Sequence, residues 1–125
     1  MASVSRERIA QVNDYGPVEE RVEDVDGIAI QFLTMREDVD ATPLLKGLPG
    51  DRCNCPHWGY VFTGRLVFDL GDREEIYEAG DAFHLTEGHV PRADPGTEYL
   101  QFSPAQELHA VSEHMTRQFQ ALQSA

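Results

Sequence analysis

Residues 60–88 read YVFTGRLVFDLGDREEIYEAGDAFHLTEG, and this stretch decides the fold. Four turn signals separate its short apolar segments: Thr63-Gly64, Gly71-Asp72, Gly80-Asp81 and Glu87-Gly88. Between the first two turns, Leu66, Phe68 and Leu70 occupy every second position, which is the period of a strand with one buried face. Many short strands joined by such turns are typical of a β-sandwich or a β-barrel.

The segments around this stretch extend the pattern in both directions. Residues 28–35 (IAIQFLTM) follow a turn at Asp26-Gly27 and predict a buried strand. Residues 18–25 predict a polar edge strand, and residues 98–102 predict the last strand. Residues 41–51 (ATPLLKGLPGD) carry two prolines and two glycines and predict a loop.

The two ends of the chain differ from this middle part. Residues 1–15 are polar and predict an arm or a short helix, so residues 16–103 are the expected barrel domain. Residues 104–125 predict one amphipathic helix, with Ser103 as its N-cap and Pro104 at its first position. Its apolar positions recur at helical spacing: Leu108, Val111, Met115, Phe119 and Leu122.

Composition excludes several classes of protein. The 125 residues are 41% hydrophobic, which suits one domain with a single core. A net charge of −12 without a basic stripe excludes nucleic acid and anionic membranes as expected partners. We find no apolar run of about 18 residues, and the N-terminus MASVSRERIA has no apolar core of a signal peptide. A cytoplasmic location is therefore expected.

The stretch 51-DRCNCPHWG-59 carries unusual chemistry. Asp51, Cys53, Cys55 and His57 alternate, which in a strand would put all four on one face. A mutual disulfide between cysteines two positions apart would be badly strained. In a reducing compartment they are thiols, metal ligands or redox groups.

Residues 51–102 resemble the cupin superfamily, which consists of small jelly-roll β-barrels. Gly64 matches the last glycine of the first cupin motif, in the frame YVFTGRLVF. Gly80-Asp81 and Gly88 match the second motif, in AGDAFHLTEG. The resemblance implies an all-β, cupin-type jelly-roll barrel with a C-terminal amphipathic helix. It also implies a homodimer and a site at the barrel mouth, where a small organic molecule would bind.

The metal ligands of the family are not preserved at their positions. Cys53 and His57 stand where the family has its second histidine and its glutamate, and Asp51 stands where it has its first histidine. Pro91 replaces the last histidine, while His89 lies two residues earlier. A rewired site would use Cys53, Cys55, His57 and His89 to bind a divalent ion, with zinc preferred and iron, nickel or manganese as alternatives.

One strand cannot readily supply three ligands to one ion, because alternate positions over five residues span about 13 Å. We therefore expect His57, His89 and one cysteine more readily than all four. Pro56 is a candidate for the bend that a third ligand from this strand would need.

Other interpretations of the cluster stay open. The residues could form a barrel interior without metal, because a free cysteine behaves as a small buried hydrophobe. His57 could activate a redox thiol, Asp51 could complete a cysteine–histidine nucleophile, and Cys55-Pro56 matches a haem-regulatory dipeptide. The expected function is a metal-dependent enzyme acting on a small molecule, or a ligand-binding or sensor module without catalysis. For an enzyme, the resemblance implies dioxygenase or isomerase chemistry.

Overall fold

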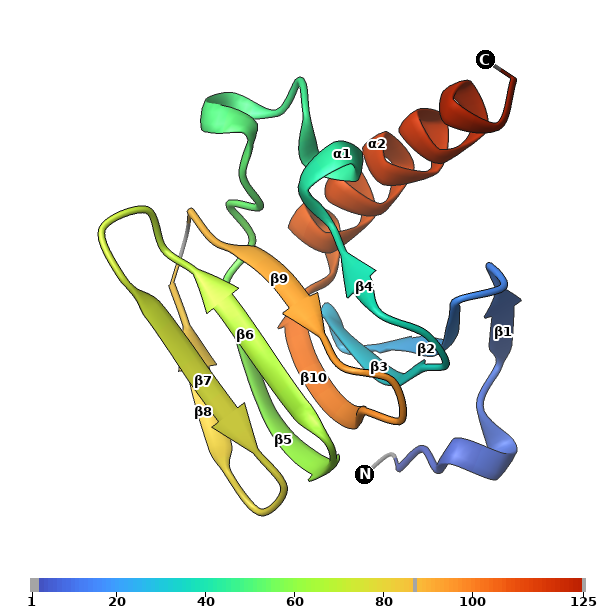
Figure 1. Cartoon of the computed structure of the whole chain (residues 1–125). Helices are drawn as coiled ribbons and strands as arrows, with labels where there is room; N and C mark the ends of the chain where they lie inside the picture. The colour runs from blue at the N-terminus through green and yellow to red at the C-terminus, as the bar shows by residue number, and fades with distance from the viewer. Residues whose placement is uncertain (1–2, 87, 125) are drawn as a thin grey trace.

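The computed structural model describes residues 3–86 and 88–124. Within them, two antiparallel sheets face each other as a jelly roll, and a long helix lies over one end (Figure 1). The predicted all-β fold with a C-terminal helix is confirmed. Among the described residues neither sheet closes on itself, so the predicted barrel is an open pair of sheets. The predicted turn at Glu87-Gly88 involves a residue outside the described ones.

The larger sheet supplies one wall of the molecule. Its strands, in spatial order, are β1 (Gln11–Asp14), β2 (Val18–Val25), β3 (Ile28–Met35), β10 (Glu98–Pro104), β5 (His57–Thr63) and β8 (Ala82–Leu85). The segment predicted as an edge strand is therefore flanked on both sides. Residues 1–15, expected as an arm or short helix, contribute a 3-10 turn at Arg6–Arg8 and the edge strand β1.

The smaller sheet supplies the opposite wall. Its strands, in spatial order, are β4 (Val39–Asp40), β9 (Val90–Ala93), β6 (Arg65–Asp69) and β7 (Glu74–Glu78). The strand β9 contains Pro91 and still pairs with both neighbours. Pro91 is tolerated because its nitrogen, which has no proton to donate, faces the β4 side of β9. That neighbour is only two residues long, so few hydrogen bonds are lost.

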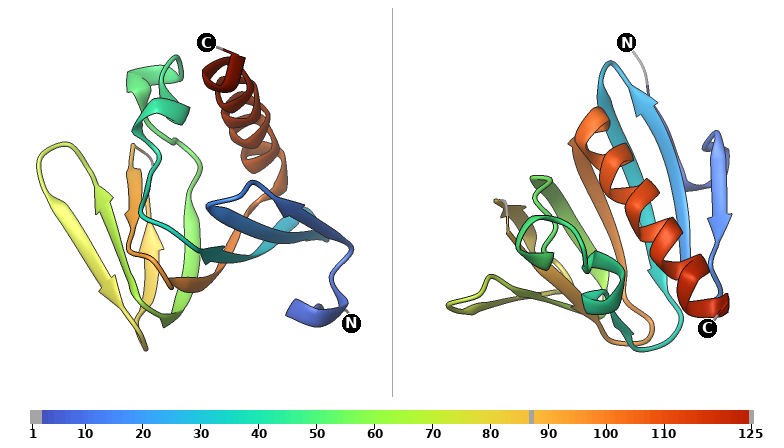
Figure 2. Two further views of the ribbon diagram at one scale, coloured as in Figure 1. Left: turned by 45° about the vertical axis from the view of Figure 1, so that its right-hand side comes forward. Right: turned by 90° about the horizontal axis from the view of Figure 1, so that it is seen from above.

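Two helices close the end of the molecule that carries the site. The expected loop at residues 41–51 contains α1 (Thr42–Leu45) and a second 3-10 turn (Pro49–Asp51). The helix α2 (Ala105–Ser124) begins one residue later than predicted, because Pro104 is still in β10. It packs against α1, β3 and β10 and lies across that end of the sheets (Figure 2). Within the described residues, no helix combines the length and the apolarity that a bilayer span requires.

The core consists of two clusters on the inner faces of the sheets. The first lies between the sheets and centres on Leu66, Phe68 and Val61. The second lies under the helices and includes Leu45, Leu108 and both cysteines. The glycine-framed stretch thus contributes much of the first cluster, and Cys53 and Cys55 belong to the second.

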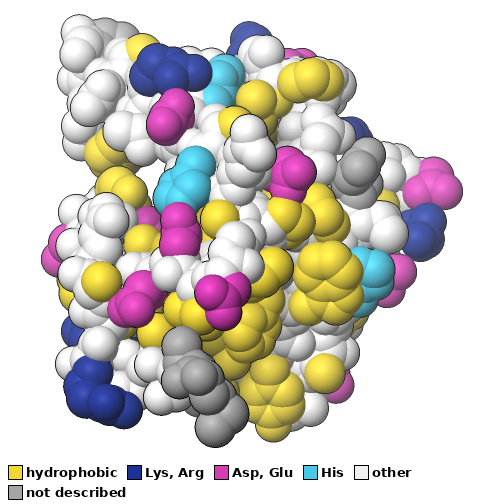
Figure 3. Space-filling view, turned by 180° about the vertical axis from the view of Figure 1, so that it is seen from behind, with side chains coloured by type: hydrophobic (Ala, Val, Ile, Leu, Met, Phe, Trp, Pro, Cys, Tyr) yellow, Lys and Arg dark blue, Asp and Glu magenta, His cyan; other side chains and the backbone are white. Residues whose placement is uncertain are grey.

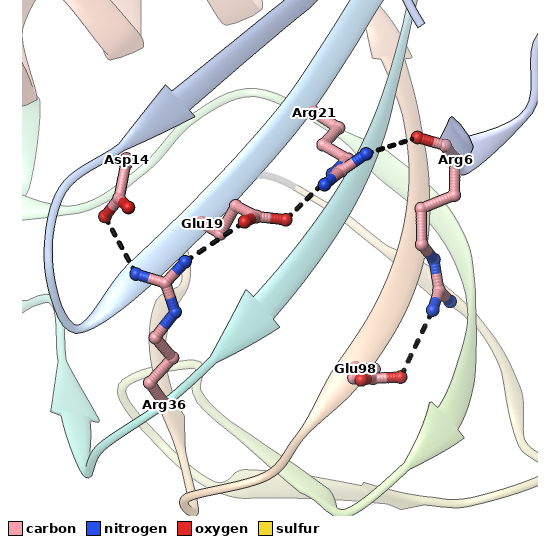
Figure 4. A network of polar contacts seen from close by, with 6 residues as sticks. All are labelled: Arg6, Asp14, Glu19, Arg21, Arg36 and Glu98. Carbon is pink, nitrogen blue, oxygen red and sulfur yellow. Dashed lines mark hydrogen bonds and ion pairs between the residues drawn. The ribbon is translucent and has the colours of Figure 1, made fainter. Parts of the chain in front are cut away.

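An ion-pair network ties the N-terminal segment to the larger sheet (Figure 4). Arg36 of the segment after β3 pairs with Asp14 at 2.8 Å and with Glu19 at 3.0 Å. Arg21 pairs with Glu19 at 2.8 Å and donates to the carbonyl oxygen of Arg6. These contacts hold β1 and the preceding 3-10 turn against β2.

Candidate functional site

The backbone before β5 is irregular, so the predicted alternation along one strand was wrong. Asp51 lies in a 3-10 turn with φ of 57°, next to Gly50 with φ of 68°. The strand begins only at His57, directly after Pro56. Asp51 is exposed, and its carboxylate accepts a hydrogen bond from the Gly47 N–H at 2.9 Å. It is therefore engaged in its own loop.

A single β-bridge brings the two motif regions together. Cys53 N donates to the His89 carbonyl oxygen at 2.9 Å, and His89 N donates back to the Cys53 carbonyl oxygen at 3.1 Å. His89 is thereby placed opposite the start of β5, and its ring lies edge-on to that of His57, with ring centroids 4.9 Å apart. The bend that the sequence required is the irregular segment between Cys53 and Pro56.

Three buried side chains meet at this point. One ligand atom each of Cys53, His57 and His89 lies within 4.8 Å of the other two. The Cys53 sulfur is 3.8 Å from His57 Nε2. Bond lengths of about 2.3 Å to sulfur and about 2.0 Å to nitrogen separate the ligands of a tetrahedral zinc by roughly 3.3–3.8 Å. Small side-chain shifts would bring these atoms to that spacing, so the residues fit the ion.

Hydrogen bonds hold both imidazoles in the orientation that a ligand needs. His89 Nδ1 lies 2.8 Å from the Thr86 carbonyl oxygen, which can only accept. Nδ1 therefore carries the proton, and the lone pair of the neutral ring is on Nε2. His57 Nδ1 lies 2.6 Å from the Ser103 hydroxyl, while its Nε2 faces the Cys53 sulfur. Such outer partners are typical of metal-binding histidines.

Burial determines the charge of the cluster. It lowers the pKa of His57 to about 3, helped by the neighbouring His89, and it lowers the pKa of His89 as well. Both rings are therefore neutral near pH 7, with lone pairs available to a cation. Burial also raises the pKa of the Cys53 thiol. A thiol in this setting is a poor nucleophile unless a bound cation stabilises its thiolate.

Cys55 lies outside this group of three. Its thiol is buried in the cluster under the helices, and its sulfur is 3.6 Å from the Pro56 carbonyl oxygen. Burial raises its pKa to about 12, although a hydrogen bond with Ser103 acts in the opposite direction. The Ser103 hydroxyl itself lies 2.6 Å from His57 Nδ1. Cys55 is therefore a buried neighbour of the Ser103–His57 contact, outside the group of three.

A cavity of about 410 Å³ adjoins the three residues. Its walls are mainly apolar and come from both sheets and both helices, including Leu33, Phe68, Leu45 and Met115. The volume falls in the range of about 300–1,000 Å³ that is usual for small-molecule sites. The sequence predicted a site at the barrel mouth, and this cavity lies at the end of the two sheets that α1 and α2 cover.

The cavity wall also contains a row of polar residues that was not predicted from the sequence. Glu20, Gln31 and Gln101 line the cavity and are 8%, 4% and 6% exposed. The pattern contained a signal for two of them, because Gln31 and Gln101 stand at inward-facing positions of apolar strands. A glutamine at a buried position of a strand needs a polar partner or a ligand.

Comparisons with known proteins identify the fold. No protein-family model and no curated protein matches the sequence. Among solved structures, an RmlC-like cupin from Shewanella frigidimarina has a TM-score of 0.59 at 14% identity, covering 83% of this chain and 91% of that one. The polyketide cyclase RemF from Streptomyces resistomycificus has the same TM-score and identity, covering 84% and 80%. KdgF from Halomonas sp. has a TM-score of 0.53 at 14% identity, covering 83% and 94%.

The chain is thus a small β-sandwich protein with a polar cluster in an apolar cavity. Its fold is that of the cupin superfamily, as the glycine frame predicted.

Proposed function

We propose that the protein binds a divalent metal ion through Cys53, His57 and His89 and holds a small organic molecule beside it in the cavity. The observation that carries this proposal is the convergence of three buried ligand atoms at the cavity wall. One thiolate and two imidazoles suit zinc better than iron, nickel or manganese. Cys55, the fourth residue of the predicted set, lies beside the site without being a ligand.

The ligand set favours one kind of chemistry. Three protein ligands leave a fourth position for water or for an atom of a bound molecule. Zinc would supply a Lewis acid there and no redox chemistry. The set also lacks the two-histidine, one-carboxylate arrangement of non-haem iron oxygenases. If the protein is an enzyme, we therefore expect isomerisation, cyclisation or hydrolysis in preference to dioxygenation.

The cavity supports the proposed binding of a small organic molecule. Its lining is mainly apolar, with few polar groups, as in sites for small organic molecules. The similarity to the polyketide cyclase RemF agrees with such a ligand. The competing function is a metal-free ligand or sensor module, in which the same cavity binds an organic molecule and the three residues form a polar part of its wall.

Metal titration tests the proposal. Purified protein should bind close to one equivalent of Zn²⁺, and Co²⁺ in its place should give the visible bands of a tetrahedral thiolate site. Cys53→Ala should remove the sulfur-to-cobalt absorption, and His89→Ala should weaken binding strongly. The matched controls are Cys55→Ala and His84→Ala, because His84 is exposed and stacks on Trp58 outside the cavity. If the wild-type protein takes up none of zinc, iron, nickel or manganese, the metal-binding proposal is overturned. The metal-free ligand or sensor module would then be the remaining function.

We also propose that the protein is a homodimer. Its interface would be the outer face of the larger sheet. Register places Ile30, Phe102 and Trp58 in one cross-strand row and Phe32, Leu100 and Tyr60 in the next. Trp58 and Tyr60 are 47% and 41% exposed. Figure 3 shows apolar side chains gathered on this face.

A second copy fits this face because an acidic chain can pair its apolar rows with the same rows of the other copy and keep most of its carboxylates apart. Arg6, which lies over the Phe32 ring, marks one side of the apolar rows. The cytoplasmic location expected from the sequence stays a prediction.

A further inference from the structure

The polar row in the cavity wall has a fixed direction. Glu20 accepts at both carboxylate oxygens, from Asn13 Nδ2 at 2.9 Å and from Gln31 Nε2. Because a carboxylate can only accept, Gln31 must turn its NH₂ group to Glu20 and its Oε1 away. Gln101 must then donate its own NH₂ group to that oxygen, at 2.8 Å. The carboxylate therefore sets the orientation of two amides beyond it.

The end of this row is an acceptor. No described residue donates a hydrogen bond to Gln101 Oε1, although the side chain is 94% buried. Among the described residues, every side-chain oxygen that is inaccessible to solvent has a hydrogen-bond partner. The oxygen is therefore open to the cavity that Gln101 lines. Its neighbour across the sheet on β5 is Gly59, which has no side chain to cover it.

The cavity offers no free cationic side chain to an anion. Among the described residues that line it, Arg92 is the only lysine or arginine, and it pairs with Glu74 outside. Glu20, Asp38 and Asp40 add negative charge to the same lining. An acidic, mainly apolar cavity with an exposed acceptor favours a neutral molecule that donates a hydrogen bond.

We propose that Gln101 Oε1 recognises a hydroxyl or N–H group of a neutral, mainly apolar ligand, and that Glu20 sets this preference from a distance. The proposal rests on the proposed function in using the same cavity, but it does not require a metal. Gln101 is the residue that contacts the ligand, and Glu20 is a positioning residue. Since Glu20→Gln supplies an amide that can donate, it would allow the row to reverse and Gln101 to present its NH₂ group instead.

Three probes of one shape test the preference: 2-naphthol, 2-methoxynaphthalene and 2-naphthoate. Binding is measured by naphthalene fluorescence on protein as purified and after metal removal. We expect 2-naphthol to bind at least about tenfold tighter than the other two in both preparations, which corresponds to one good hydrogen bond at about 1.4 kcal/mol. Gln101→Leu should remove this advantage and leave all three probes equal.

Glu20→Gln gives the decisive readout, because a merely structural glutamate would not invert a preference. It should weaken 2-naphthol and strengthen 2-naphthoate, while Glu78→Gln, the same change on the exposed surface of β7, should alter neither. Equal binding of the three probes to the wild type, no binding of any, or an unchanged ranking in Glu20→Gln would overturn the proposal. None of these results bears on the metal titration, so the two proposals fail separately.

Discussion

His57 Nδ1 lies 2.6 Å from the Ser103 hydroxyl, and this contact joins the first residue of β5 to the inner face of β10. Ser103 is fully buried. Its hydroxyl can accept the His57 Nδ1 proton. It thereby leaves the Nε2 lone pair directed at Cys53.

Ser103→Ala should weaken metal binding by about 10–100-fold, which is the usual effect of losing the hydrogen-bond partner that orients a histidine ligand. It should also lower stability by about 1–3 kcal/mol, because a buried imidazole nitrogen loses its partner. Competition for Zn²⁺ against a coloured chelator measures the affinity at a temperature where the variant is folded. Ser112→Ala, on α2 at the far side of the cavity, is the control. Equal affinities for the two variants would refute the positioning role of Ser103.

The two cysteines should behave differently. Cys53→Ala should abolish the thiolate–cobalt absorption, whereas Cys55→Ala should retain it and bind one equivalent of metal. The reason is that only the Cys53 sulfur lies with the two imidazole nitrogens. Visible absorption of the Co²⁺-loaded variants checks this prediction, with unfolding curves to show that both are folded. If Cys55→Ala loses the band as fully as Cys53→Ala, both thiols are ligands.

The fold could be predicted from the sequence because its signals are local. Alternating Leu66 and Phe68 and the glycine turns around them specify short strands without reference to the rest of the chain. The site could be predicted only in part. Alternation suggested one strand from Cys53 onwards, but residues 54–56 belong to no strand and β5 begins only at His57. Cys53 instead forms a bridge to His89. Such pairing across 36 positions leaves no periodic trace.

The polar row in the cavity wall could not be predicted from the sequence either, because its members are distant in sequence. Gln31 and Gln101 meet across β3 and β10, 70 residues apart in sequence. Each residue looks like an isolated exception in an apolar strand until the register is known. Glu20 was hidden further by its neighbours Glu19, Arg21 and Glu23, which made β2 look like a solvated edge strand.

Gly64, the motif glycine at the β5–β6 turn, should not tolerate a side chain. Its φ is +82°, and an added Cβ would lie 2.4 Å from Thr97 Oγ1 and 2.5 Å from the Thr97 Cα. Gly64→Ala should therefore cost more than about 3 kcal/mol, through strain and overpacking together. Gly16 has a similar φ of +87°, but an added Cβ would have no atom within 4 Å. Gly16→Ala should therefore lower the free energy of unfolding by only about 1 kcal/mol. Urea unfolding compares them, and equal losses would show that strain alone matters.

Glu19 should make stability depend on pH. Hydrogen bonding from Arg21, with the charge of Arg36, holds the pKa of its carboxyl below the ordinary 4.5. A lowered folded-state pKa contributes stability above that ordinary value, and the contribution is lost as pH falls through the folded-state pKa. Glu19→Gln should thus lower stability slightly at pH 7, by about 0.2–1 kcal/mol, and the difference should shrink below pH 4.5.

Unfolding at a series of pH values measures this difference, and Glu37→Gln, an exposed carboxyl without a described ion pair, is the control. Added salt should reduce the Glu19 effect as well, because the network is partly exposed. A difference that persists undiminished at pH 3 would show that Glu19 acts through packing instead of charge.

Trp58 should decide the oligomeric state. Its ring is about half exposed on the outer face of β5 and stacks on His84 of the edge strand β8, with ring centroids 4.6 Å apart. Trp58→Glu would place two carboxylates against each other in a symmetric dimer, where they would lose water without gaining a partner. Sedimentation should therefore give twice the 14.0 kDa chain mass for the wild type and the single mass for the variant. Ile76→Glu, an equally exposed apolar residue on β7 of the other sheet, should stay dimeric. A monomeric wild type would overturn the proposed dimer. Dissociation by Ile76→Glu alone would show that the interface lies on the other sheet.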